Sequence, residues 1–400
     1  MVNDFNCKLL KVKTAQIIDT APLVLDIGVV LLLAATLGLL ARKLGLPAIL
    51  GYLLTGLLVS PFTPGYVAGS EQLIILADIG VILLLFEVGI EIDLRRLRSE
   101  QRSIFWAAPL QIIIGLLISV PIFTWFGLPF WGAVLIGLSV AMSSSVVIVN
   151  IVRSRRRTTN PATETALLGW SIVQDITGVA IAAIVLTIIG VGDRPLPLAL
   201  LGLVGFGVLA FLASKALPKL LRFVKWEGDL FLIYSVSIGL TIAAIGTVVF
   251  GIPMALAAFV AGLALNQGRE TDEVRRVLLP FRDLFAVLFF VVMGSLISFK
   301  NLDQSIPFAL ALIFLLIVGK TLPALLITKF SGVNARPAQL AVGLSQLGEF
   351  SFVLGSAALT QGLISEIQFT AVLMVVVVSI VGSSLIVRMF KPLQNNNLAI

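Results

Sequence analysis

The stretch GLPAILGYLLTGLL at residues 45–58 has a second copy at residues 251–264, which reads GIPMALAAFVAGLA. At a constant offset of 206, five positions are identical in the two copies: Gly45/Gly251, Pro47/Pro253, Leu50/Leu256, Gly56/Gly262 and Leu57/Leu263. A second match, at an offset of 205, joins DIGVILLLFEVG at residues 78–89 to DLFAVLFFVVMG at residues 283–294. Because two separate segments share nearly the same offset, the chain contains an internal repeat.

The repeat lies in a chain built of apolar runs. Of 400 residues, 58% are hydrophobic and 12% charged, whereas a soluble domain is about 45–50% apolar and about 25% charged. The runs approach the roughly 20 residues that cross a bilayer as a helix, and they are too continuous for β-barrel strands. The composition therefore predicts an all-α polytopic membrane protein and excludes a soluble enzyme. We expect thirteen helices, at 22–41, 47–60, 72–91, 104–126, 129–152, 163–191, 195–214, 230–250, 253–267, 278–298, 305–328, 337–362 and 368–387.

The repeat offset moves the second helix onto the ninth and the third onto the tenth, a shift of seven helices. Because seven is odd, the two copies cross the membrane in opposite directions. Inverted repeats of this kind are typical of secondary transporters, whose sites lie near the bilayer midplane at broken helices. The same register pairs 129–152 with 337–362, where we expect the breaks. The predicted segments are an N-terminal tail (1–21), a membrane domain (22–392) with repeats at about 22–191 and 230–390, and a polar tail (393–400).

The basic residues are distributed unevenly between the two sides of these helices. Of the 28 Lys and Arg, 22 fall in loops on one side and five on the other. By the positive-inside rule the N-terminus is outside and the C-terminus is cytoplasmic. We interpret the densest group, Arg153 and 155–157, as part of this signal and as a contact for anionic lipid rather than nucleic acid.

The rare residue types exclude several kinds of chemistry. The chain has no histidine and one cysteine, Cys7, which excludes histidine-ligated metals, histidine bases and an internal disulfide. It also has no HExxH or GxGD motif, so we expect neither an enzyme nor a cofactor.

Ionisable residues inside the apolar runs are the candidate site, because an ionisable group in mid-membrane is costly and usually functional. Gln174 and Asp175 lie in the middle of 163–191, where the carboxyl group could hold either a cation or a proton. The amide oxygen of Gln174 is a neutral ligand that suits a weakly held monovalent cation. Lys320 lies in the middle of 305–328, and Asp175 is its best partner. The alternatives are a purely structural ion pair, or a lysine that reaches the membrane interface.

Polar residues at the two expected breaks extend this candidate site. Ser143, Ser144 and Ser145 favour local bonding over helix continuity, and the broken ends would expose helix dipoles to an ion. Gln346 and Glu349 lie in the paired helix, and Glu87 lies deep in 72–91; we assign these three a supporting role. The alternatives are ordinary small-residue packing for the serines and an ion pair with a cytoplasmic arginine for Glu349.

The motifs taken in order resemble one family from about residue 22 to residue 390. The segments GLPAILGYLLTGLLVSP, DIGVILLLFEVGIEIDL, SSSVVIVN, VQD, FRDLFAVLFFVVMG and LSQLGEF resemble the monovalent cation:proton antiporter-2 family, Kef-type and NapA-like exchangers most of all. The resemblance implies the NhaA-like fold, a homodimer, and crossed unwound helices beside Asp175. It also implies that Lys320 is the lysine of many relatives, and the pair Gln174-Asp175 is similar to Kef-type proteins and favours potassium.

Kef-type proteins usually continue into an RCK domain, which we do not expect here because no GxGxxG fingerprint follows a strand. We expect that a separate cytoplasmic regulatory subunit could supply this function. We therefore expect an antiporter of pH homeostasis, exchanging potassium or sodium for protons one for one, in the bacterial cytoplasmic membrane. Two alternatives remain at this point, a cation channel or leak pathway gated by a partner and a sodium-coupled solute symporter.

Overall fold

The computed structural model describes residues 21–60, 70–91, 102–152, 159–190, 195–224, 228–252, 254–265, 271–297 and 302–390. The predicted basic cluster at 153–157 and most of both tails lie outside these ranges. Regular structure within them is helical throughout. The elements of the first half are α2 (Ala21–Lys43), α3 (Ile49–Leu58), α4 (Ser70–Glu91), α6 (Ile104–Trp125), α7 (Phe130–Ala141), α8 (Ser145–Val152) and α9 (Pro161–Ile188).

The second half continues in the same manner. Its elements are α10 (Leu196–Val224), α11 (Gly228–Val248), α12 (Met254–Leu265), α13 (Thr271–Ser295), α14 (Leu302–Leu315), the π-helix η1 (Leu316–Thr321), α15 (Leu322–Phe330), α16 (Pro337–Leu344), α17 (Phe350–Thr360) and α18 (Glu366–Met389). In the part of the chain described, nine helical segments are long and apolar enough to cross a membrane, and four shorter apolar helices accompany them. The all-helical membrane fold is thus confirmed.

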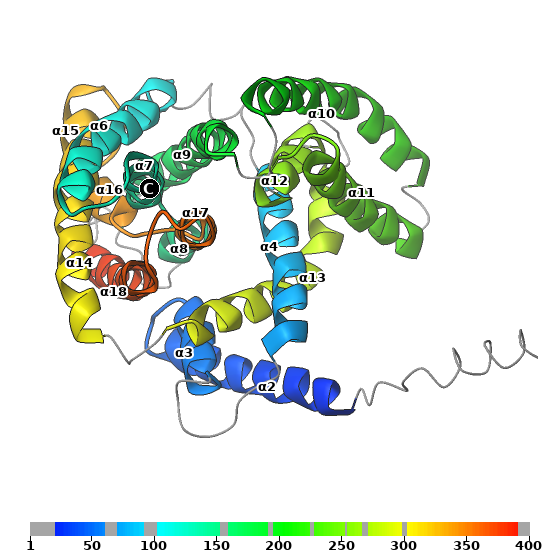
Figure 1. Ribbon diagram of the computed structural model, residues 1–400, viewed down its shortest axis with the longest axis horizontal. Helices are drawn as coiled ribbons and strands as arrows, with labels where there is room; N and C mark the ends of the chain where they lie inside the picture. Colours follow the sequence, from blue (N-terminus) through cyan, green and yellow to red (C-terminus); the bar gives the residue numbers. More distant parts are fainter. Residues whose placement is uncertain are drawn as a thin grey trace, which may run out of the picture.

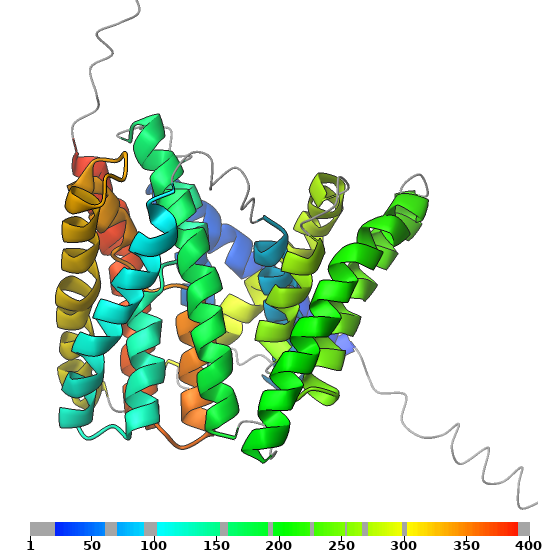
Figure 2. The same ribbon diagram turned by 90° about the horizontal axis from the view of Figure 1, so that it is seen from above.

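The helices form two bundles that lie side by side (Figures 1 and 2). We call α6–α9 with α14–α18 the core bundle, and α2–α4 with α10–α13 the second bundle. The bundles meet at α17, where Phe350 packs edge to face against Phe259 of α12 with ring centroids 6.3 Å apart. Phe352 packs similarly against Phe289 of α13, at 5.8 Å. Aromatic side chains therefore form part of the boundary between the bundles.

Glycines of the internal repeat bring the helices of the second bundle into close contact. A Cβ added at Gly56 of α3 would meet the Val291 carbonyl oxygen of α13, and one added at Gly262 of α12 would meet the Phe86 carbonyl oxygen of α4. Repeat-related residues thus make repeat-related contacts, since Gly262 and Phe86 are the counterparts of Gly56 and Val291. The same holds for Gly294 against Leu53 and Gly89 against Phe259. These reciprocal contacts explain why glycine recurs at both positions of the repeat.

The breaks expected in 129–152 and 337–362 are present. The first break, residues 142–144, separates α7 from α8, and Met142 adopts an extended conformation there. The second break, residues 345–349, separates α16 from α17. Serine side chains occupy both breaks, consistent with their competition for backbone hydrogen bonds.

Two predicted helices differ in detail from the observed ones. The predicted helix 305–328 contains the π-helical turn η1, in which the Thr321 hydroxyl donates to the Leu316 carbonyl five residues earlier at 2.8 Å. Pro323 follows this turn and has no N–H to donate to the preceding turn. In addition, α13 begins at Thr271 rather than 278, so Arg275 lies on the helix and not in a loop. An apolar run indicates only the part of a helix that lies in the lipid. Where the helix continues beyond the lipid in charged residues, the apolar pattern does not detect it.

Candidate ion-binding site at two helix breaks

The two breaks lie against each other inside the core bundle. The Ser143 hydroxyl donates to the Leu344 carbonyl at the end of α16, at 2.9 Å. A Cβ at Gly348 would lie 2.8 Å from the Ser143 carbonyl carbon and oxygen, so the second break passes over the first at van der Waals distance. Across this crossing the Glu349 carboxylate accepts hydrogen bonds from Ser144 at 2.8 Å and from Ser145 at 2.9 Å. It therefore lies at the N-terminus of α8, where the helix dipole favours an anion.

Lys320, from the separate segment η1, makes hydrogen bonds to both breaks. Its side chain is fully buried and extends from the π-helical turn η1. The ammonium group donates to the carbonyl oxygens of Met142 in the first break and Gln346 in the second, each at 2.6 Å. A π-helical turn is frequently found at functional sites. The carbonyls that the broken helices leave available thus hold a buried cationic group.

Asp175 lies in the middle of α9, beside the first break, and is 1% exposed. Its carboxylate interacts electrostatically with Lys320, so the structure brings together the two residues that the sequence predicted as a pair. The ammonium hydrogen bonds described above, however, go to backbone carbonyls. Lys320 therefore acts on Asp175 as a nearby fixed charge.

Two buried glutamines place amide oxygens in the same region. Gln174 donates from its amide nitrogen to the Ala141 carbonyl at 3.2 Å and to the side-chain oxygen of Gln111 on α6. Gln346 donates from its amide nitrogen to the Ser144 carbonyl at 3.4 Å. Within the described part of the chain, the side-chain oxygens of Gln174 and Gln346 have no hydrogen-bond partner. A buried amide oxygen without a hydrogen-bond partner is unfavourable. A bound cation would remove this cost by accepting the oxygen as a ligand.

Comparison with known proteins shows the family of the chain. Residues 29–391 match the transmembrane region of the sodium/hydrogen exchanger family. The chain belongs to this family. The exchanger is 30% identical over 380 residues to YbaL of Escherichia coli (strain K12), which is named as a candidate cation/proton antiporter; the match covers 90% of the exchanger and 67% of YbaL. Family and fold together make the exchanger a multi-pass integral membrane transporter.

Solved structures give the same fold. The exchanger superposes on the sodium proton antiporter MjNhaP1 of Methanocaldococcus jannaschii at pH 8 with a TM-score of 0.74, at 20% identity, over 92% of this chain and 98% of that one. An electron-microscopy map of MjNhaP1 gives a TM-score of 0.62 at 18% identity, over 90% and 94% of the two chains. At these identities the likeness concerns the fold.

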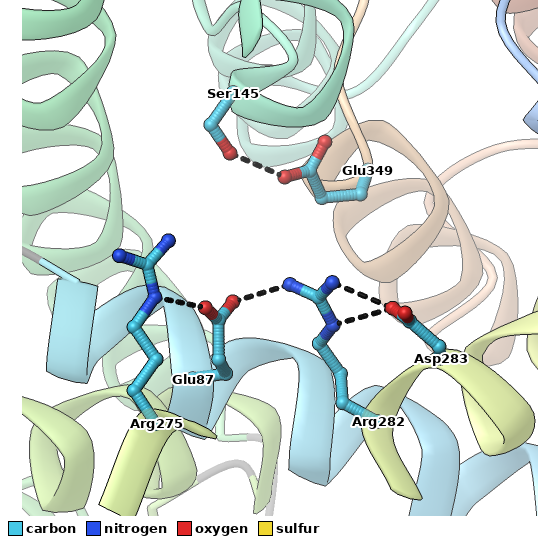
Figure 3. A network of polar contacts seen from close by, with 6 residues as sticks. All are labelled: Glu87, Ser145, Arg275, Arg282, Asp283 and Glu349. Carbon is cyan, nitrogen blue, oxygen red and sulfur yellow. Dashed lines mark hydrogen bonds and ion pairs between the residues drawn. The ribbon is translucent and has the colours of Figure 1, made fainter. Parts of the chain in front are cut away.

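The predicted supporting residue Glu87 belongs to a different cluster of the exchanger (Figure 3). It lies on α4, and its two carboxylate oxygens pair with Arg275 at 3.0 Å and Arg282 at 2.6 Å, both on α13. Arg282 also pairs with its neighbour Asp283 at 2.6 Å. We call these four residues the α4–α13 charge cluster. Glu349 and Ser145 of the core bundle face it, and Arg282 interacts electrostatically with Glu349.

Gln111 is the residue at the site that reasoning from the sequence missed. It is fully buried and contacts Gln174 directly. A polar residue within the run AAPLQIIIGLL of α6 was the available signal. Gln111 lies outside the matched segments of the repeat, and its amide carries no charge that would mark it as an ionisable group in the membrane.

Proposed function

We propose that the exchanger moves a monovalent cation and a proton in opposite directions by alternating access, with potassium preferred over sodium. One observation carries this proposal. The buried carboxylate of Asp175 lies beside Lys320, whose ammonium group is held by backbone carbonyls of both helix breaks. A single carboxylate in that position can be neutralised by a proton or by a cation, and it can take only one of them at a time.

The cation ligands follow from the contacts at the breaks. Asp175 would supply the charged oxygen, and Gln174 and Gln346 would supply the amide oxygens that have no hydrogen-bond partner among the described residues. The hydroxyls of Ser143, Ser144 and Ser145 donate elsewhere, but each oxygen still has lone pairs to offer. One carboxylate among neutral oxygens suits a weakly held monovalent ion, and the resemblance of the Gln174-Asp175 pair to Kef-type exchangers favours potassium.

Lys320 would keep the site electrically balanced when neither substrate is bound. An ionised carboxylate in the membrane interior is expensive unless a countercharge lies nearby. When a cation enters, it takes over the neutralisation of Asp175, and the ammonium remains on the carbonyls of Met142 and Gln346. The cation and Lys320 therefore repel each other, which keeps cation affinity low enough for release.

The two bundles supply the movement. Side chains of α17 pack on α12 and α13 through aromatic rings, a boundary along which the core bundle could slide while it carries the site. With one carboxylate at the site, each cycle would carry one cation one way and one proton the other, without net charge movement. Reversal potentials that show net charge movement in each cycle would contradict this stoichiometry.

The cellular setting is part of the same proposal. We place the exchanger in the bacterial cytoplasmic membrane, N-terminus outside and C-terminus in the cytoplasm, as a homodimer. A separate cytoplasmic subunit could regulate it.

The proposal is tested with purified protein in liposomes that contain a pH-sensitive dye. After a pH gradient is imposed, potassium or sodium is added outside. We expect wild type to dissipate the gradient, potassium more effectively than sodium, and Asp175→Asn to behave like protein-free liposomes. Asp303→Asn is the matched control, because Asp303 is an exposed carboxylate in the first turn of α14. A potassium diffusion potential without proton movement would indicate a channel instead, and would contradict the proposal.

A further inference from the structure

Gln111 is a fully buried polar residue in the otherwise apolar middle of helix α6. It is buried in α6, and its side-chain oxygen accepts a hydrogen bond from the Gln174 side-chain nitrogen. Its own nitrogen has no hydrogen-bond partner within the described residues. A buried amide that leaves one of its groups unsatisfied is unfavourable compared with an apolar side chain, so a role beyond packing is indicated.

The orientation of the Gln174 amide follows from the group opposite it. The Ala141 carbonyl can only accept a hydrogen bond, so the Gln174 atom that faces it at 3.2 Å must be the nitrogen. The second hydrogen of that nitrogen points at Gln111, which must therefore present its oxygen. With both hydrogens engaged, the Gln174 oxygen is directed away from Gln111 and Ala141. It is the atom that has no partner among the described residues.

We propose that Gln111 is a positioning residue for cation binding, acting by fixing the Gln174 amide with its oxygen towards the ion beside Asp175. This inference rests on the proposed function, since it assigns a role at the same cation site. Without Gln111, the bond to Ala141 would be the one hydrogen bond from the described residues that still holds the amide. A rotated amide would present its nitrogen, whose hydrogens repel a cation. Gln111 thus acts through Gln174 and does not itself contact the ion.

The experiment measures cation affinity in two ways on the full chain. One is the KM for potassium in the liposome assay, and the other is the rise in unfolding temperature that potassium causes in the detergent-purified protein. The variants are Gln111→Leu, Gln174→Leu and the double variant. Ser119→Ala is the matched control, because Ser119 is a buried polar residue of α6 that bonds within its own helix to Gly115.

We expect Gln111→Leu to raise the potassium KM about three- to tenfold, the range for loss of one hydrogen bond, with little change in maximal rate. Because Gln111 acts through Gln174, the double variant should bind potassium no more weakly than Gln174→Leu alone. Ser119→Ala should bind like wild type. An unchanged KM in Gln111→Leu, or losses that multiply in the double variant, would overturn the role.

The thermal measurement separates this inference from the proposed function. If wild type is stabilised by potassium but does not exchange it for protons, the proposed function fails. The positioning role is then decided by the thermal shifts of the three variants alone. If potassium and sodium neither move through wild type nor stabilise it, both proposals are overturned.

Discussion

Glu87 and Asp175 are two carboxylates buried to the same extent, each 1% exposed, but their surroundings differ completely. Both oxygens of Glu87 are paired with guanidinium groups, of Arg275 and Arg282. Asp175 has Lys320 nearby as a charge, while the ammonium hydrogen bonds go to the carbonyls of the helix breaks. Burial alone therefore does not mark a transport site. A carboxylate held on both oxygens by fixed cations stabilises structure, whereas one beside a charge engaged elsewhere can exchange its counter-ion.

The sharpest test of this comparison neutralises each carboxylate in turn. Asp175→Asn should remove cation-dependent proton movement altogether, because a neutral amide takes up no proton that an incoming cation could displace. Glu87→Gln, in whatever fraction folds, should keep the potassium KM of wild type. The measurement is the liposome assay, normalised to the amount of folded protein. Loss of coupling in folded Glu87→Gln, with coupling retained in Asp175→Asn, would reverse the assignment.

The same pair of variants should have the opposite effect on stability. Glu87→Gln leaves the guanidinium groups of Arg275 and Arg282 facing a neutral amide inside the bundle. Breaking a fully buried pair costs about 3–5 kcal/mol. The side chains of Arg275 and Arg282 are 31% and 22% exposed, and Arg282 keeps its pair with Asp283, so the loss should lie below that range but still lower the unfolding temperature in detergent. Asp283→Asn is the matched control from the same α4–α13 charge cluster. Its side chain is 67% exposed, and exposed pairs contribute about 0–1 kcal/mol. Equal losses in the two variants would show that burial of the pair does not matter.

Lys320→Met should give a smaller, mixed result. It removes two charge-assisted hydrogen bonds to the breaks, each worth about 1.5–3 kcal/mol, so stability should fall. Removal of the ammonium also removes its repulsion of the incoming ion, so potassium should bind several-fold more tightly at the same pH. Thermal shifts with and without potassium measure both effects. Weaker potassium binding would mean that Lys320 helps to form the cation site and does not compete with it.

The smallest effect is expected where the core bundle faces the α4–α13 charge cluster. Ser145→Ala removes one of the two hydroxyl groups that donate to Glu349. Ser144 and the N-terminus of α8 remain to hold that carboxylate, so the cost should be about 1 kcal/mol. Ser145 is also one of several neutral oxygens proposed as cation ligands, so the potassium KM should rise only about two- to threefold. An unchanged KM would remove Ser145 from the cation ligands, and a tenfold rise would mean that the contact of Ser145 with Glu349 matters for ion binding as well.

Much of the fold could be predicted because membrane helices are encoded locally. The apolar runs located the helical segments, and the repeat indicated the two helices that contain the breaks at residues 142–144 and 345–349. The start of α13 was missed, because a helix that leaves the lipid continues in charged residues such as Arg275 that resemble a loop. The π-helical turn at Lys320 was also missed, since it depends on hydrogen bonds that no apolar pattern records.

The site could be predicted only in part. Asp175 and Lys320 stand out because any charge in an apolar helix does. Which atoms they meet is decided by tertiary packing, so the Met142 and Gln346 carbonyls could not be foreseen as the ammonium partners. The placement of Glu87 with two arginines has the same explanation, and so does the contact of Gln111 with Gln174, which joins residues from separate helices.

If Asp175 holds a proton or a cation but never both, then cation binding must release protons into the solution. This release can be measured on the purified protein. Potassium is added to detergent-purified exchanger in a weakly buffered solution that contains a pH dye, near the pH at which the site is half protonated. We expect wild type to acidify the solution, in a saturable manner, as potassium binds. Asp175→Asn should release no protons. Potassium binding to wild type without proton release would mean that Asp175 does not exchange a proton for the cation.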